Sequence, residues 1–231
     1  MIAELRSLAR GDLRTDVDLA AHTRWRIGGK ADCCVSPGTI DACRAVVERC
    51  RAEGLRFMVI GDSSNLLFDD RGYRGVLVHI GRPLSQVDIR GGEVTVQAGA
   101  WVPAVARRVG GAGLTGIEHI VGIPGTFGGL VCMNGGSLRQ GIGESIVEVS
   151  AIMPDATMQQ LPASACGFAY RRSRFQQTGA IVVEAKLALA HGDVTGIRRR
   201  MIEIMASRRR RFPLKLPNCG SVFVSDPPMY Q

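Results

Sequence analysis

The stretch Val59-Ile60-Gly61-Asp62-Ser63-Ser64-Asn65 joins a compact apolar run to a loop of small, hydrogen-bonding residues. The run at residues 57–60 has the length and composition of a buried strand. In the loop, glycine and serine allow the main chain to approach a ligand closely, and successive N–H groups can point at an oxyanion. This pattern favours a pyrophosphate-binding loop, and a plain turn remains the alternative interpretation.

The segments around this stretch predict a mixed α+β fold. A strand at residues 31–35, a helix at residues 41–53 and the strand at residues 57–60 together suggest a βαβ unit. Apolar runs predict further strands at residues 76–80, 94–97, 146–153 and 181–189. Helical spacing predicts helices at residues 102–109 and 193–211, the second ending before Pro213.

Composition places the chain among folded proteins without a membrane span. Hydrophobic residues make up 45% and charged residues 22% of the 231 residues, enough for one large domain or two small ones. Residues 1–16 lack an apolar signal core, so we expect a cytoplasmic protein. The cysteines number seven and form no Cys-x-x-Cys pair, which indicates reduced thiols and no metal site.

Positive charge is concentrated in one late segment. The formal net charge is +8, and residues 198–211 hold seven arginines. Nucleic-acid binding normally interleaves aromatic residues with positive charge, and aromatic residues are only 5% here. A solvated helix face and a phosphate-bearing small ligand remain the two interpretations of this segment.

A second glycine-rich tract covers Gly122-Ile123-Pro124-Gly125-Thr126-Phe127-Gly128-Gly129 and leads to Met133-Asn134. Glycine at this density usually marks backbone that something flat or charged approaches closely. Two phosphate-friendly loops in one small protein predict a large nucleotide between two lobes. The pattern Gly111-x-Gly113-x-x-Gly116 follows a predicted helix instead of a strand, so we do not interpret it as a dinucleotide fingerprint.

Five segments, taken in order, resemble the UDP-N-acetylenolpyruvoylglucosamine reductase (MurB) family, in its shorter subtype. The segments are His22-Thr23-Arg24-Trp25-Arg26-Ile27-Gly28-Gly29-Lys30-Ala31-Asp32, Gly61-Asp62-Ser63-Ser64-Asn65-Leu66-Leu67, Gly122-Ile123-Pro124-Gly125-Thr126 with Met133-Asn134, Gly167-Phe168-Ala169-Tyr170-Arg171-Arg172-Ser173, and Pro217-Asn218-Cys219-Gly220-Ser221-Val222-Phe223. The likeness extends over nearly the whole chain from about residue 18.

The resemblance implies a two-lobed FAD-binding fold of the vanillyl-alcohol-oxidase (PCMH) type with a truncated third, substrate-binding lobe. The expected division is an N-terminal helix or extension at residues 1–17, an FAD-binding domain at residues 18–190 and an incomplete substrate-binding domain at residues 191–231. It also implies non-covalent FAD and NADPH as hydride donor. The implied reaction reduces the enolpyruvyl group of UDP-N-acetylglucosamine enolpyruvate to UDP-N-acetylmuramate for peptidoglycan.

The resemblance also assigns roles to individual residues. Arg171 matches the active-site arginine beside the enolpyruvyl carboxylate, and Ser221 matches the serine that protonates the enol. The implied cofactor-binding residues are Gly61, Asp62, Ser63, Ser64, Asn65, Ile123, Pro124, Gly125, Thr126 and Gly128. The implied substrate-binding residues are Asn134, Tyr170 and Arg211. The expected partner is a UDP-sugar, with no nucleic acid, no membrane and a monomeric state.

The sequence departs from the family pattern near its C-terminus. The family glutamate falls beyond Gln231, and Val224-Ser225 stand where a basic residue and asparagine are usual. Two hypotheses therefore remain open. The protein is a reductase of this family, or it is a flavin-binding relative that is inactive or reduces a different enoyl substrate.

Overall fold

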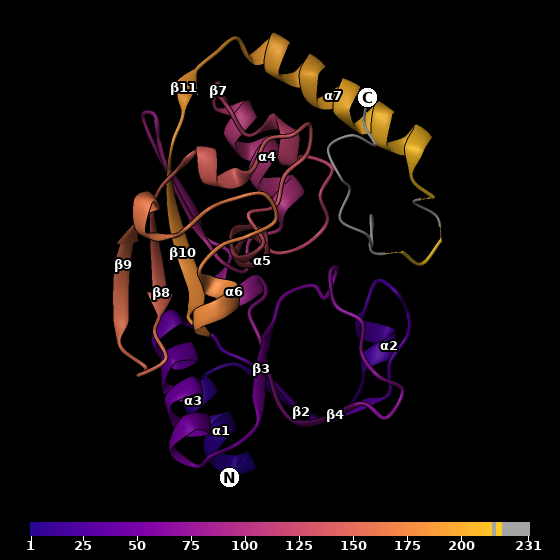
Figure 1. Ribbon diagram of the computed structural model, residues 1–231, viewed down its shortest axis with the longest axis vertical. Helices are drawn as coiled ribbons and strands as arrows, with labels where there is room; N and C mark the ends of the chain where they lie inside the picture. Colours follow the sequence, from indigo (N-terminus) through magenta and orange to yellow (C-terminus); the bar gives the residue numbers. More distant parts are fainter. Residues whose placement is uncertain (214–215, 219–231) are drawn as a thin grey trace.

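The computed structural model describes residues 1–213 and 216–218, which form two α+β lobes and a long helix (Figure 1). Each lobe is built on its own sheet. The long helix α7 (Val194–Arg211) lies across the second lobe, at the end of the molecule opposite α1 (Ile2–Ala9) and α3 (Ile40–Ala52). Asp193 caps α7, because its carboxylate accepts hydrogen bonds from the N–H groups of Thr195 and Gly196.

The first sheet has the strand order β1-β2-β4-β3. Its strands are β1 (Asp12–Asp18), β2 (Lys30–Ser36), β3 (Phe57–Ile60) and β4 (Tyr73–His79). Strands β2, β4 and β3 run parallel and β1 runs antiparallel to β2. The βαβ unit β2-α3-β3 is confirmed, but β4 inserts between its two strands. Helix α2 (Leu19–His22) follows β1 directly.

The second sheet is antiparallel and has the order β5-β6-β10-β8-β9. Its strands are β5 (Val87–Arg90), β6 (Glu93–Gln97), β8 (Ile146–Ile152), β9 (Met158–Pro162) and β10 (Ile181–Ala188). A short pair, β7 (Leu114–Thr115) and β11 (Ala190–His191), lies beside it. The remaining α-helices of the described chain are α4 (Val102–Gly111), α5 (Phe127–Cys132) and α6 (Phe175–Thr178). Short 3-10 helices occur at η1 (Arg82–Leu84), η2 (Glu118–Ile120), η3 (Ile142–Glu144) and η4 (Ala163–Ala165).

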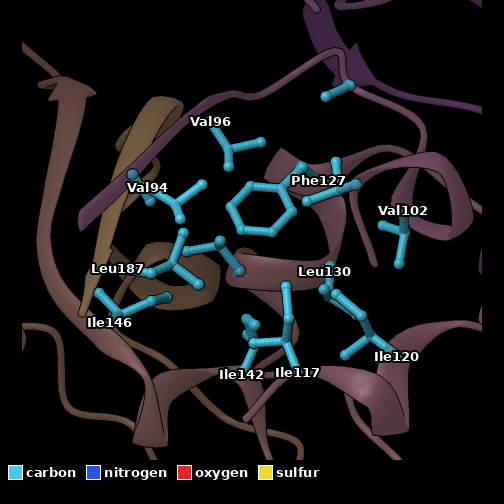
Figure 2. Packing of buried hydrophobic residues seen from close by; sticks show 14 of the residues in the cluster. Val94, Val96, Val102, Ile117, Ile120, Phe127, Leu130, Ile142, Ile146 and Leu187 are labelled. Carbon is cyan, nitrogen blue, oxygen red and sulfur yellow. The ribbon is translucent and has the colours of Figure 1, made fainter. Parts of the chain in front are cut away.

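Phe127 lies at the centre of the core of the second lobe. Its side chain is fully buried, and Figure 2 shows its ring among Val94, Val96 and Leu187 of the sheet. Ile117, Ile120 and Ile142 close the cluster on the side away from the sheet. This core anchors α5, and therefore holds the glycine tract that precedes α5 in the sequence.

The predicted elements with clear periodicity are confirmed to within a few residues. The helices predicted at residues 41–53, 102–109 and 193–211 are α3, α4 and α7, and the strand predicted at residues 57–60 is β3. Strands β1, β5 and β9 were not predicted, because each has many exposed polar residues and pairs at the edge of its sheet. The Gly111–Gly116 pattern follows α4 and contains β7, so it does not have the strand-to-helix context of a dinucleotide fingerprint.

The two lobes share a hydrophobic cluster. Ile152, Ile181 and Val183 of the second sheet pack into the same cluster as residues of α1, α3 and the first sheet. Arg51 of α3 crosses between the lobes at the edge of this cluster: its Nη1 donates to the carbonyl oxygen of Met153 at 2.6 Å, and its guanidinium lies over the ring of Phe57. Burial and side-chain contacts therefore join the lobes through α3.

Replacing Arg51 with alanine should lower the free energy of unfolding by about 1–3 kcal/mol, because a charged hydrogen bond to a carbonyl between the lobes is lost. Arg44→Ala is the matched control on the same helix. Its exposed ion pair with Glu48, 3.3 Å long, should contribute no more than about 0.5 kcal/mol. Urea unfolding measures both variants, and equal destabilisation would contradict the role of Arg51.

Candidate functional site

The two glycine-rich loops predicted to bind a nucleotide lie against one another. Ser64 of the first loop donates a hydrogen bond from Oγ to the carbonyl oxygen of Pro124 at 3.0 Å. A Cβ atom added to Gly125 would lie 2.8 Å from Ser64 Oγ, and one added to Gly61 would overlap the side chain of Thr126. The loops approach this closely only because both positions are glycine.

The first loop, Gly61–Asn65, begins where β3 ends. Ligands of open parallel sheets bind at this edge, outside the carboxyl ends of the strands. Ser63 adopts a left-handed conformation with φ of 50° and is buried. Within the described residues, the N–H groups of Asp62, Ser63, Ser64 and Asn65 donate no hydrogen bond. A row of unoccupied N–H groups is the arrangement that suits phosphate oxygens.

The second loop, Gly122–Thr126, connects η2 to α5. Gly125 has φ of 134°, and its carbonyl oxygen accepts a hydrogen bond from Val102 N–H at 3.0 Å. Ile123 packs against the core of the second lobe. Gly128 lies in the first turn of α5, and its N–H donates a hydrogen bond to the carbonyl oxygen of Ala98 at 2.7 Å. A Cβ atom added to Gly128 would lie 2.7 Å from the Cβ atom of Ala98. Ile123 and Gly128 thus attach the second loop and the start of α5 to the core of the second lobe.

The predicted active-site arginine lies at the tip of a tight turn. Ala169 and Arg172 exchange two backbone hydrogen bonds of 3.0 Å, so Tyr170 and Arg171 form the tip. Arg171 has φ of 53°, its Nη2 approaches the carbonyl oxygen of Gly136 at 3.5 Å, and its guanidinium lies near the ring of Tyr170. Tyr170 is 65% exposed. A positive φ is unfavourable for a residue with a side chain, so the contacts around Arg171 must hold the turn in this conformation.

Asn134, just after the end of α5, connects this turn to the segment that follows the second loop. It also has a positive φ of 40°. Its Nδ2 donates to the carbonyl oxygen of Ala169 at 2.8 Å, and its Oδ1 accepts from Gly143 N–H at 2.9 Å. Asn134 was predicted as a substrate-binding residue. The structure places it beneath Arg171, with both ends of its amide engaged by the protein.

Arg208 lies near enough to two other arginines, Arg171 and Arg211, for their charges to affect it. The side chain of Arg208, on the last turns of α7, covers Gly122, and its guanidinium stacks on Phe212 at 4.8 Å. Burial lowers the pKa of Arg208, and the charges of Arg211 and Arg171 lower it further. None of the three forms an ion pair with an acidic residue in the described part of the chain.

The structure brings the two predicted loops into contact. Arg208 covers Gly122 of the second loop and feels the charges of Arg171 and Arg211, while Ser221 lies outside the described residues. Sequence reasoning did not single out Arg208 among the seven arginines of residues 198–211. The signal for it was its position four residues after Ile204, on the buried stripe of α7.

Other chemical possibilities are limited in the described residues. The six described cysteines are free, and burial raises the pKa of Cys43 to about 12, so this thiol stays protonated near neutral pH. No group of histidine, cysteine or acidic side chains there could hold a metal ion. A cavity of about 510 Å³ beside the first turns of α7, lined by residues such as Glu118 and Arg200, contains none of the predicted site residues.

Among the described residues, no helix combines the length and apolar character that a membrane span requires.

Comparison with known proteins agrees with this geometry. A sequence family described as an FAD binding domain matches residues 31–162. The chain is 39% identical over 216 residues to UDP-N-acetylenolpyruvoylglucosamine reductase 1 of Corynebacterium glutamicum, covering 94% of this chain and 64% of that protein. It is 35% identical over 230 residues to the reductase of Halalkalibacterium halodurans, covering all of this chain and 76% of that protein.

Solved structures show the same fold. The crystal structure of UDP-N-acetylenolpyruvylglucosamine reductase (MurB) from Thermus caldophilus superposes with a TM-score of 0.80 at 28% identity, over 94% of this chain and 77% of that chain. BBE-like 1 of Physcomitrella patens shares the fold alone, with a TM-score of 0.60 at 16% identity, over 83% of this chain and 44% of that chain. These likenesses confirm the two-lobed FAD-binding fold expected from the sequence, and the chain belongs to the UDP-N-acetylenolpyruvoylglucosamine reductase (MurB) family.

Proposed function

We propose that this protein is a cytoplasmic, monomeric flavoenzyme that uses FAD and NADPH to reduce the enolpyruvyl group of UDP-N-acetylglucosamine enolpyruvate to UDP-N-acetylmuramate. The observation that carries the proposal is the contact of two backbone-lined loops directly beside three arginines that lack acidic partners. Backbone-lined loops suit the pyrophosphate of a dinucleotide, and arginines without acidic partners suit an anionic substrate bound next to it. NADPH oxidation that depends on the enolpyruvyl substrate tests the proposal.

The proposed division of the chain follows the site. Residues 18–190 form the FAD-binding domain, residues 1–17 precede it, and residues 191–231 begin the substrate-binding domain. The support is that α7, which opens the last segment, contributes Arg208 and Arg211 to the arginine group.

The residues present fit FAD. The cradle at Gly61 and Gly125 has no space for a Cβ, and the free N–H groups of Asp62–Asn65 can hold the pyrophosphate. When bound, FAD supplies the hydride that NADPH provides. The protein's task is to fix the dinucleotide between the lobes and to keep its reactive ring beside the arginines.

Arg171 would bind the substrate carboxylate. Hydride addition to the enolpyruvyl double bond moves negative charge onto that carboxylate, and a guanidinium held in place stabilises the charge as it develops. Asn134 and the paired Ala169–Arg172 turn hold Arg171 before substrate arrives. Tyr170, Arg208 and Arg211 are then free to contact the UDP diphosphate, and Ser221 would protonate the enol, a role that rests on the family resemblance.

Gly61→Ala should weaken FAD binding at least tenfold and lower stability by about 1–3 kcal/mol, because the new methyl group overlaps Thr126 and separates the loops. Gly111→Ala is the control, since a Cβ at the end of α4 meets nothing within 4 Å. Flavin fluorescence titration and urea unfolding measure the two effects. An FAD affinity unchanged from the parent would refute the cradle.

All FAD should be bound without a covalent link. Acid precipitation of the yellow protein should release the flavin completely into the supernatant, because no histidine or cysteine lies within Gly61–Asn65 to form a bond. Flavin absorbance of the supernatant and the pellet gives the result, and colour retained in the pellet would disprove the prediction.

Arg171→Gln should slow substrate-dependent flavin reoxidation by about a hundredfold to a thousandfold, the usual cost of removing one electrostatic partner of the transition state. Flavin reduction by NADPH should stay within a few fold of the parent. Arg172→Gln, an exposed neighbour in the same turn, should leave both half-reactions intact. Stopped-flow absorbance at the flavin band separates the halves.

Two results would overturn different parts of the proposal. Reoxidation of Arg171→Gln at the parent rate would remove the arginine from the mechanism. An FAD-loaded parent that consumes no NADPH with the enolpyruvyl substrate would instead favour the alternative, a flavin-binding relative that is inactive or reduces a different enoyl compound.

A further inference from the structure

Trp101 is a large aromatic side chain left 44% exposed beside the proposed FAD site. It lies between β6 and α4, just before the first residue of α4. The chain has only two tryptophans, and none of the roles assigned so far includes this one. An exposed indole is unusual enough to need a reason, because tryptophan normally buries most of its apolar surface.

Backbone pairing fixes the direction of the indole. Trp101 and Thr126 face each other in an antiparallel bridge. The flanking hydrogen bonds run from Val102 N–H to Gly125 and from Phe127 N–H to Ala100, at 3.0 and 2.8 Å. Trp101 and Thr126 are therefore the non-hydrogen-bonded pair of this bridge. Two such residues place their side chains on the same face, at the shortest separation that strand pairing allows.

The face shared by these two side chains is the junction of the glycine loops. The side chain of Thr126 lies directly against Gly61, the first residue of the loop that would hold the pyrophosphate. The side chain of Trp101 therefore leaves the backbone on the face where Thr126 meets this loop.

Arg107 restrains the indole from the side of α4. Its guanidinium carbon lies 5.2 Å from the centre of the indole ring, a cation–π arrangement. A restrained ring loses little further freedom when a ligand stacks on it, and rigid aromatic side chains therefore make efficient contacts.

We propose that Trp101 is a stacking platform for one planar ring of FAD, the adenine or the isoalloxazine. The inference rests on the FAD binding proposed above and adds a residue to it. Both rings are joined to the pyrophosphate through a sugar or ribityl chain, so a platform beside the phosphate loops is within reach of either. An indole in this position adds dispersion and stacking to a site otherwise built from backbone and small side chains.

The test is FAD binding by variants of the full chain, freed of flavin and titrated with FAD. Trp101→Leu should weaken FAD binding about tenfold or more, as loss of a base-stacking aromatic typically does. Trp101→Phe keeps a ring and should bind FAD within about threefold of the parent. Trp25→Phe is the matched control and leaves Trp101 as the single tryptophan of the chain.

ADP and FMN identify the ring. If adenine stacks, Trp101→Leu should weaken ADP binding by the same factor as FAD binding and leave FMN binding unchanged. ADP, which does not absorb in the emission range of tryptophan, should then also quench the fluorescence of Trp101 in the Trp25→Phe protein. If the isoalloxazine stacks, the loss should appear with FMN instead of ADP.

Failure of the stacking platform and failure of the proposed function would give different results. A Trp101→Leu protein that binds FAD, ADP and FMN as tightly as the parent would overturn the platform, with the FAD site itself intact. A folded parent that binds no FAD would overturn the proposed function. Urea unfolding midpoints of Trp101→Leu and Trp101→Phe close to that of the parent would show that a loss of affinity comes from loss of the ring and not from unfolding. If both variants were strongly destabilised, Trp101 would be structural, contrary to the proposal.

Discussion

The close contact between the two glycine loops, in which small side chains pack directly on glycine backbone, sets the position of the rest of the proposed site. Gly61 belongs to the first lobe and Thr126 to the second, and no side-chain atom of position 61 separates them. The side chain of Thr126 therefore packs directly on the main chain of Gly61, and this contact sets the distance between the lobes at this point. Trp101 is paired to this junction through Thr126, and Arg208 rests on Gly122 of the same loop.

Positive charge gathers around Arg208 near this junction. Arg208 is half-buried, and its burial together with the charges of the exposed Arg211 and Arg171 lowers its pKa. An anion bound beside Arg208 would offset this repulsion. Because such an anion binds the folded protein and not the unfolded chain, its binding would stabilise the fold.

Local sequence patterns were enough to single out the two loops that the structure brings into contact. The loops at residues 61–65 and 122–126 stood out by their density of glycine and small hydrogen-bonding residues, a composition that a plain turn also has. The insertion of β4 between β2 and β3 was not predictable, because strand order depends on long-range pairing. The part played by Asn134, and the distinction of Arg208 from its six neighbouring arginines, depend on contacts between segments distant in the sequence.

The hydrophobic cluster shared by the lobes bears on the modularity of the fold. Ile152, Ile181 and Val183 complete the core around α3, although they come from β8 and β10, two adjacent strands of the other lobe's sheet. Cutting the chain between the sheets would strip the first lobe of apolar neighbours that the sequence supplies only a hundred residues later, on the order of a whole domain's length. The first lobe therefore completes its core with residues of the second, and the contact between the glycine loops depends on both lobes being present.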